Sequence, residues 1–137
     1  MIAAAPPAAP PDGGVSASVL ARGVSAGTLQ LKAKGVTDVI VRTITIAPGG
    51  STGWHHHDGQ LLVVVKSGTL TRVLQDCSVE VAHAGSVFIE PSGARNRHIG
   101  RNLGTEPVVL YATYLLPQGS PLSVEAEAPS CAGHPGE

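Results

Sequence analysis

The stretch Gly53-Trp54-His55-His56-His57-Asp58-Gly59-Gln60 places three consecutive histidines between glycines and is the most informative part of this 137-residue chain. On an extended segment, residues two apart point to the same side, so His55 and His57 can direct two imidazoles at one point while His56 points away. Neutral imidazole binds Zn, Cu, Fe and Ni. The spacing therefore predicts two ligands of a metal site, with a third from a distant part of the chain.

Short runs rich in β-branched residues surround the histidines and alternate with Gly, Pro, Asn and Asp. Such spacing is typical of an all-β sandwich or barrel, and helix is nearly absent. A turn at Ala47-Pro48-Gly49-Gly50 ends one run, so we expect the histidines on the loop that follows. The expected strands are 18–23, 27–32, 39–46, 59–66, 68–75, 78–81, 86–89, 97–102 and 108–116.

The length suits one domain. Residues 1–14 are rich in Ala, Pro and Gly, so we expect a flexible arm there. The barrel should occupy 15–117, and 118–137 should form an extended C-terminal tail packed on it.

Charge argues against polyanionic partners, and hydropathy argues against a membrane-spanning segment. The formal net charge is −1 and the basic residues are scattered, which argues against nucleic acid and anionic membranes. The longest uncharged apolar run, 61–65, is far below the roughly 20 residues needed to cross a bilayer.

Two cysteines, Cys77 and Cys131, lack the close spacing of a zinc knuckle, so we expect one disulfide, with two free buried thiols as the alternative. The bridge would tie the tail to the barrel and contribute about 4 kcal/mol by restricting the unfolded chain. It would also indicate a secreted or extracytoplasmic protein. Residues 1–7 lack the basic and long apolar regions of a signal peptide but could be the remnant of one, so a cytoplasmic location stays open.

A second informative stretch runs from Gly85 through Glu90-Pro91-Ser92-Gly93 to His98 and Asn102. Together with Gly49, His55, His57 and Gly68, it resembles the two motifs of the cupin family. The resemblance implies an antiparallel jelly-roll barrel with a metal ion held by His55, His57 and His98, and Asn102 as a supporting residue in the second shell of the site. It also implies a homodimer.

The sequence departs from the family pattern at two places. Leu61 stands where cupins usually carry a glutamate ligand, and two extra residues precede His98, so that Asn96 takes the usual histidine position. We prefer His98 because it keeps its spacing to Asn102. Gln60, Glu90 or water could take the fourth position; we favour water, and Glu90 could instead pair with Arg95 or Arg97 at a strand end.

The expected cofactor is one divalent transition metal: Fe, Mn, Ni, Cu or Zn. Trp54 should pack at the barrel mouth and line the pocket there. Tyr111 and Tyr114 lie on opposite faces of the last strand, and we assign Tyr111 to the pocket lining. Three histidines with open positions suit a dioxygenase-type enzyme acting on a small organic molecule. The alternatives are a non-catalytic module that binds metal or a small ligand, and a barrel that has lost its metal.

Overall fold

The computed structural model describes residues 13–132, and strands make up nearly all of its regular structure. In chain order the elements are β1 (Val24–Ser25), β2 (Thr37–Ile46), β3 (His55–His56), β4 (Gln60–Ser67), β5 (Thr69–Val73), β6 (Val79–His83), β7 (Ser86–Glu90), the 3-10 turn η1 (Ala94–Asn96), β8 (Ile99–Arg101), β9 (Val108–Pro117), β10 (Val124–Glu125) and the 3-10 turn η2 (Ser130–Ala132).

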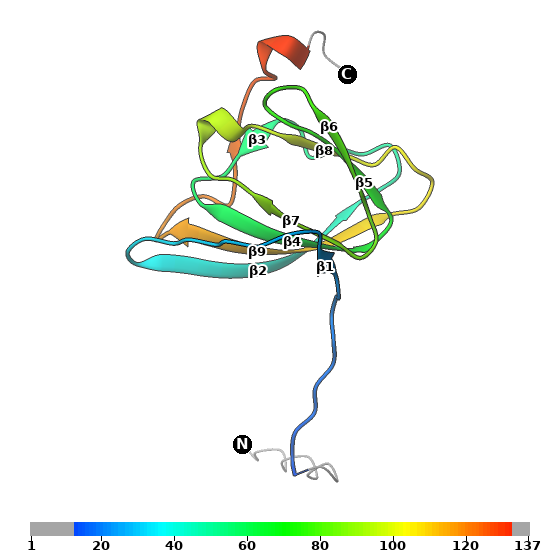
Figure 1. Ribbon diagram of the computed structural model, residues 1–137, viewed down its shortest axis with the longest axis vertical. Coiled ribbons are helices and arrows are strands. Elements are labelled where there is room, and N and C mark those ends of the chain that lie inside the picture. The colour runs from blue at the N-terminus through cyan, green and yellow to red at the C-terminus, as the bar shows by residue number, and fades with distance from the viewer. Residues whose placement is uncertain (1–12, 133–137) are drawn as a thin grey trace, which may run out of the picture.

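Three sheets surround one core (Figure 1). The largest has the order β1-β7-β4-β9-β2, a second has the order β6-β5-β8, and a third pairs β10 with β3. All pairs are antiparallel except β1 with β7. The prediction of an all-β antiparallel barrel is therefore confirmed.

Strict alternation along the two central strands builds the core. Every second residue of β9, and of β4 as far as Val65, is buried, because successive side chains of a strand point to opposite faces. The buried side chains of these strands are Leu61, Val63, Val65, Val108, Leu110, Ala112, Tyr114 and Leu116. The same alternation turns Tyr111 to the outer face, where the ammonium of Lys66 lies over its ring.

The chain before β2 differs from the expectation of strands at 18–23 and 27–32. Only Val24 and Ser25 find a ladder partner, in Ser86 and Val87 of β7, and the rest of the segment has no strand beside it to pair with. Residues from 13 to β1 extend away from the barrel (Figure 1). Residues 1–12, and with them most of the arm expected over 1–14, lie outside the described part of the chain.

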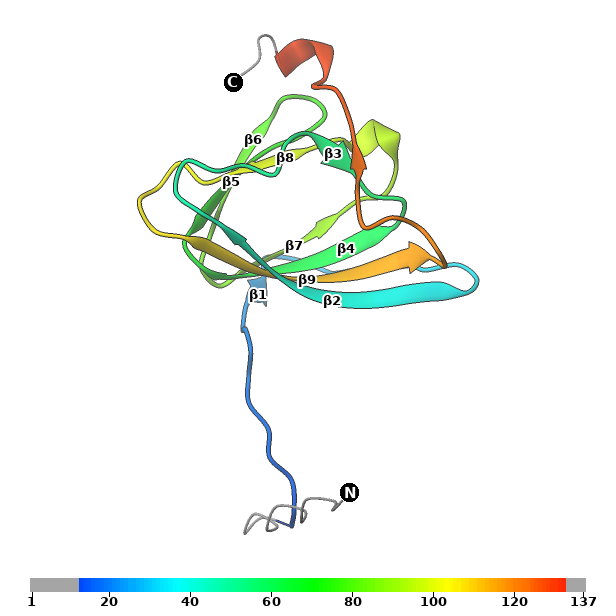
Figure 2. The same ribbon diagram turned by 180° about the vertical axis from the view of Figure 1, so that it is seen from behind.

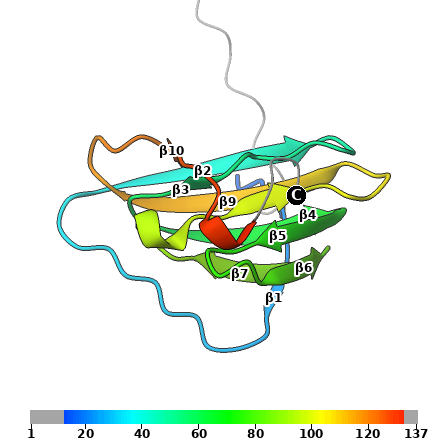
Figure 3. The same ribbon diagram turned by 90° about the horizontal axis from the view of Figure 1, so that it is seen from above.

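The tail after β9 returns to the histidine segment (Figures 2 and 3). Val124 and Glu125 of β10 pair with His56 and His55 of β3, so the histidine stretch is a short strand rather than a free loop. Beyond β10, a disulfide joins Cys131 to Cys77, as predicted. The tail is therefore attached at β10 and again within η2, and it lies over the histidines.

The described residues contain no helix long and apolar enough to span a membrane.

Candidate metal centre

The backbone holds His55 and His98 face to face. Each donates its amide N–H to the carbonyl of the other at 3.0 Å, forming an isolated antiparallel bridge. Directly opposite residues of such a pair place their side chains on the same face. The two ring centroids are consequently only 4.4 Å apart.

The turn η1 absorbs the two extra residues that precede His98. Within it, the Asn96 side chain donates to the carbonyl of Ser92 at 2.7 Å and so is held within its own loop. The Asn96 carbonyl lies 2.9 Å from His98 Nδ1. The structure thus brings His98, and not Asn96, to His55.

Glu90 supplies the carboxylate of the site from β7. Its register partner on β4 is Leu61, the position at which the family resemblance led us to expect a glutamate. Paired residues share a face of the sheet, so Glu90 points where a carboxylate at position 61 would point. A carboxylate therefore already stands where we expected water.

Gln60 and the neighbouring arginines take no part in this arrangement. Because side chains alternate along β4, Gln60 points to the face opposite Leu61. On that side its Oε1 accepts the amide N–H of Lys32 at 2.7 Å. Arg97 donates to Gln75 and to the carbonyl of Glu127 rather than to Glu90.

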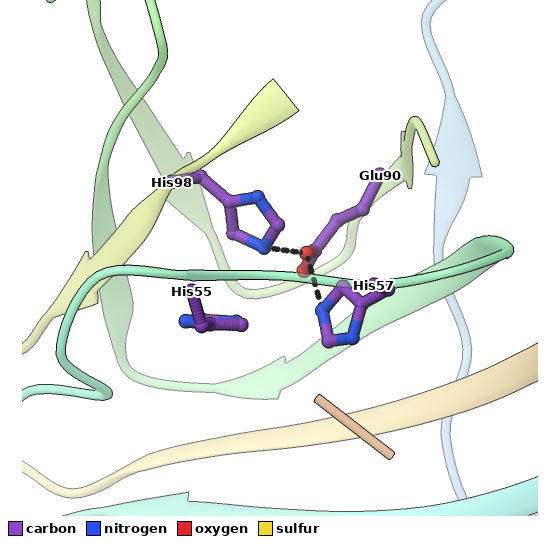
Figure 4. Close-up of side chains that lie close together, drawn as sticks. All are labelled: His55, His57, Glu90 and His98. Atoms are coloured by element: carbon purple, nitrogen blue, oxygen red, sulfur yellow. Dashed lines mark ion pairs between the residues drawn. The ribbon is translucent and has the colours of Figure 1, made fainter. Parts of the chain in front are cut away.

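His55, His57, Glu90 and His98 form one cluster, drawn in Figure 4. One donor atom from each lies within 4.8 Å of the others. His57 and His98 are only 3% and 4% exposed, so water does not reach them freely. Glu90 Oε2 lies 3.2 Å from His57 Nε2 and also contacts His98 Nε2.

Each histidine of the cluster is oriented through its other ring nitrogen. The Nδ1 atoms of His55, His57 and His98 lie 2.8, 2.7 and 2.9 Å from the carbonyls of Gly53, Leu122 and Asn96. A carbonyl can only accept, so each Nδ1 carries the proton and donates it. Each neutral ring then presents a lone pair at Nε2, the state and orientation that metal-binding histidines show.

The centre of the cluster consequently lacks a donor. His57 Nε2, His98 Nε2 and Glu90 Oε2 are all buried without a hydrogen-bond partner. Lone pairs that face one another repel unless a proton or a cation lies between them, and buried polar atoms left unpaired are costly. The donor set, three imidazoles and one carboxylate, fits a divalent transition metal.

The electrostatics of the metal-free cluster agree with this geometry. Burial raises the pKa of Glu90, but the imidazoles of His57 and His98 beside it outweigh burial and hold the pKa well below its usual range. Burial lowers the pKa of His98, but Glu90 raises it overall. Burial lowers the pKa of His55, with the neighbouring histidines adding to the effect. Glu90 therefore stays ionised, and its carboxylate favours a positive charge at the centre of the cluster.

The cluster opens into a small cavity of about 50 Å³ inside the barrel. Its walls are mostly apolar, from Leu61, Val63, Leu70, Leu110 and others, and the polar members outside the cluster are Thr52, Arg72 and Tyr114. The assignment of Tyr111 to the pocket was wrong, because the buried face of β9 carries Tyr114. Trp54 is half-buried and does not line this cavity either.

Sequence reasoning missed two contributors to the site. Arg72 is buried on the inward face of β5, and only its alternation with Leu70 could have indicated this. Leu122 contributes a backbone carbonyl from 65 residues away, for which the sequence carries no signal.

Asn102 supports the barrel wall rather than the ligands themselves. Its Nδ2 donates to the carbonyls of Ile46 and Glu106, and its Oδ1 accepts the amide of Gly104. It is 1% exposed. It therefore connects the end of β2 to the loop between β8 and β9.

The remaining histidines lie outside the cluster. His56 points toward Asp58, 3.9 Å away, and His83 is exposed on β6 beside Thr69. His134 is outside the described residues.

Comparison with known proteins identifies the same architecture. Residues 42–114 match the cupin domain family. Among curated proteins no match is found. An uncharacterized conserved protein with a double-stranded β-helix domain from Klebsiella pneumoniae is similar, at 26% identity and a TM-score of 0.56, over 67% of this chain and 77% of that one.

Two enzymes share the fold at lower identity. One is a polyketide cyclase from Streptomyces resistomycificus, with 20% identity, a TM-score of 0.55, and 69% and 67% of the two chains covered. The other is a DMSP lyase from Ruegeria pomeroyi, with 13% identity, a TM-score of 0.57, and 66% of this chain but 44% of the lyase covered.

Proposed function

Because this chain belongs to the cupin family, whose domain matches 73 of its 137 residues (42–114), we propose that it is a metal-dependent enzyme of dioxygenase type acting on a small organic molecule. The metal ligands are His55, His57, Glu90 and His98. The observation that carries the proposal is the set of buried, unpaired acceptor atoms that face one another at the centre of the cluster.

The donor atoms define the class of metal. Imidazole and carboxylate together suit Fe, Mn, Ni, Cu and Zn, whereas soft thiolate ligands are absent because both cysteines are in the disulfide. Four protein donors leave room for further ligands on an ion that prefers five or six. Such an ion supplies Lewis-acid chemistry and, if it is redox-active, electron transfer to or from a bound molecule.

The chain's own residues prepare this position. The carbonyl-bound Nδ1 atoms fix the three rings, so little reorganisation is needed when an ion binds. The ring of Tyr114 packs edge-on against His57, with centroids 5.7 Å apart. The apolar walls exclude water and thereby strengthen the electrostatic interactions inside.

The relatives do not decide the reaction. A cyclase and a lyase share this barrel, so the fold hosts several chemistries and the site must be tested directly.

A non-catalytic metal-binding module is the second candidate function. The cavity of about 50 Å³ favours it, because this volume holds only a few water-sized molecules. The enzyme proposal therefore requires that substrate also use space outside the cavity.

Metal analysis of untagged protein tests the proposal. We expect one equivalent of Fe, Mn, Ni, Cu or Zn in the wild type, and a loss of at least about tenfold in affinity for H98A and E90A. H83A serves as the control, since His83 is exposed and outside the cluster. Wild-type protein that binds no metal would refute both functions, and stoichiometric metal without oxygen consumption on any small organic substrate would leave the binding module.

The disulfide and the exposed sheet edge support two further proposals. We propose that the protein works in an extracytoplasmic, oxidising compartment, where such a bond persists. We also propose a homodimer, because the edge strand β2 exposes Val39 and Val41, 62% and 64% accessible, to a second copy. Cell fractionation with thiol labelling tests the first; light scattering of the wild type and of V39E/V41E, expected to be monomeric, tests the second.

A further inference from the structure

Arg72 is an unusual residue for the wall of an aliphatic barrel. It alternates with Leu70 along β5, points inward and is only 5% exposed. Among the described residues that line the cavity of the metal centre, it is the one Lys or Arg. A buried guanidinium carries a large desolvation cost unless its charge and its N–H groups are satisfied.

The partners of Arg72 satisfy it incompletely. One terminal nitrogen donates to Glu80 Oε2 at 2.7 Å, and the guanidinium lies over the ring of Phe88 at 3.8 Å from its centroid. Glu80, its cross-strand neighbour on β6, has a side chain that is 55% exposed. Within the described chain this is the single hydrogen bond of the group, so several of its N–H donors are free for another acceptor.

Arg72 also borders a second space. A groove of about 540 Å³ lies outside the cavity and shares two residues with it, Arg72 and His98. Apolar side chains of Leu74, Phe88 and Ile89 line part of this groove. A molecule in the groove would therefore contact the guanidinium at one end of an apolar surface and lie next to a ligand of the proposed metal.

The balance of charge favours an anion at this place. A divalent ion with three neutral imidazoles and the Glu90 carboxylate would keep one positive charge. The charged side chains that line the groove, Arg72 and Arg97 against Asp76 and Glu80, cancel one another, so the sum at this place is positive. An anion bound to the buried guanidinium of Arg72 would lie next to the metal ligand His98 and be attracted by this charge. The guanidinium fork matches a carboxylate in two parallel hydrogen bonds.

We propose that the groove binds a small carboxylate with an apolar body, and that Arg72 holds its carboxylate group in place of Glu80. This assignment rests on the proposed metal-dependent function and names the substrate class of the same site. Arg72 is thus a specificity-determining residue. In the absence of substrate, the Glu80 carboxylate accepts the hydrogen bond that Arg72 would donate to the ligand.

Zinc-loaded protein titrated with propionate and with its neutral counterpart propionamide tests this proposal by calorimetry. We expect propionate to bind at least about tenfold more tightly than propionamide. R72Q should weaken propionate binding by about tenfold or more. E80Q should strengthen it, because it removes the competing carboxylate, and R95Q, the same change at an arginine of η1 that lines neither space, should leave it unchanged.

Zinc content measured in each sample separates the two proposals. If the wild type holds no zinc, the metal function fails, and the same titrations on metal-free protein then decide the role of Arg72. Stoichiometric zinc with equal propionate affinity in wild type and R72Q would overturn the carboxylate site and leave the metal site intact. Should R72Q not fold, an unchanged or weakened affinity in E80Q would overturn it as well.

Discussion

Removal of the disulfide should weaken metal binding although neither cysteine approaches the metal ligands. The bond joins residues 54 apart in sequence, and closing a loop of that length restricts the unfolded chain by about 4 kcal/mol. What it holds locally is the tail, whose Leu122 carbonyl accepts the Nδ1 proton of His57 at 2.7 Å. In C77S/C131S, we expect that carbonyl to leave and His57 to lose its fixed orientation.

The magnitude follows from the contacts of the tail. Residues 122–127 are held by the ladder between β10 and β3 and by three further hydrogen bonds, donated by His57 Nδ1, by the amide of Ala126 and by Arg97. At about 1 kcal/mol for each of the three, about 1.5 kcal/mol for the ladder and about 1.5 kcal/mol for the half-buried Leu122, these contacts contribute about 6 kcal/mol. Ordering six residues costs about 6 kcal/mol or more. The cross-link therefore decides whether the tail stays bound, and losing it should lower zinc affinity roughly 10- to 100-fold, the range for outer partners of ligating histidines.

Competition against a chelator measures the zinc affinity, and hydrogen exchange at the Ala126 amide reports whether the tail has detached. Truncation after residue 120 is the matched control, because it removes the same carbonyl directly and should give the same affinity. Zinc affinity within twofold of wild type, in protein whose tail amide exchanges freely, would refute the view that the tail orients His57.

Three further predictions concern the barrel and its ligands. In metal-free protein the low pKa of Glu90 adds stability above the ordinary glutamate pKa of 4.5, and the raised pKa of His98 adds stability below the ordinary histidine pKa of 6.5. The lowered pKa of His55 acts in the opposite sense and removes stability below pH 6.5, so the melting temperature should peak near pH 6.5 in a scan from about pH 4 to about pH 9. Zinc affinity should rise with pH because protons compete with the ion for His98; a zinc affinity independent of pH would contradict this. E90L should lose at least roughly 100-fold in zinc affinity. L61E/E90L should regain most of that affinity, since the two positions are directly opposed on β4 and β7. If chelator competition shows no recovery, a carboxylate at position 61 cannot replace Glu90. N102A should destabilise the protein by about 3 kcal/mol in urea unfolding, because it leaves a buried carbonyl, a part-buried carbonyl and an amide without partners. A loss below about 0.5 kcal/mol would mean that water replaces the side chain.

The barrel could be predicted because its signals are local. β-branched runs between glycines and prolines located most strands to within a few residues, and period-two alternation of β4 and β9 marks the core. The prediction of strands before β2 was wrong for the opposite reason. The segment has a strand-like composition, but strand pairing depends on a neighbour in space, and only two of its residues have one.

Only part of the metal site could be predicted from the sequence. His55 and His57 follow from spacing, but the role of Glu90 depends on the register of β7 against β4, which a single sequence does not encode visibly. The same holds for Arg72, whose burial contradicts the usual place of arginine, and for the carbonyl of Leu122, since every residue carries a carbonyl. The missed parts are those fixed by tertiary contacts.

The register that opposes Leu61 to Glu90 also gives a ligand a way to change strands during evolution. Because the two side chains share one face, a barrel with glutamate at either position can acquire the second before it loses the first. The intermediate would hold two carboxylates beside three imidazoles, and a divalent cation between them would offset their mutual repulsion. Because at least one of the two glutamates is present at every step, metal binding is kept while the ligand moves from one strand to the other.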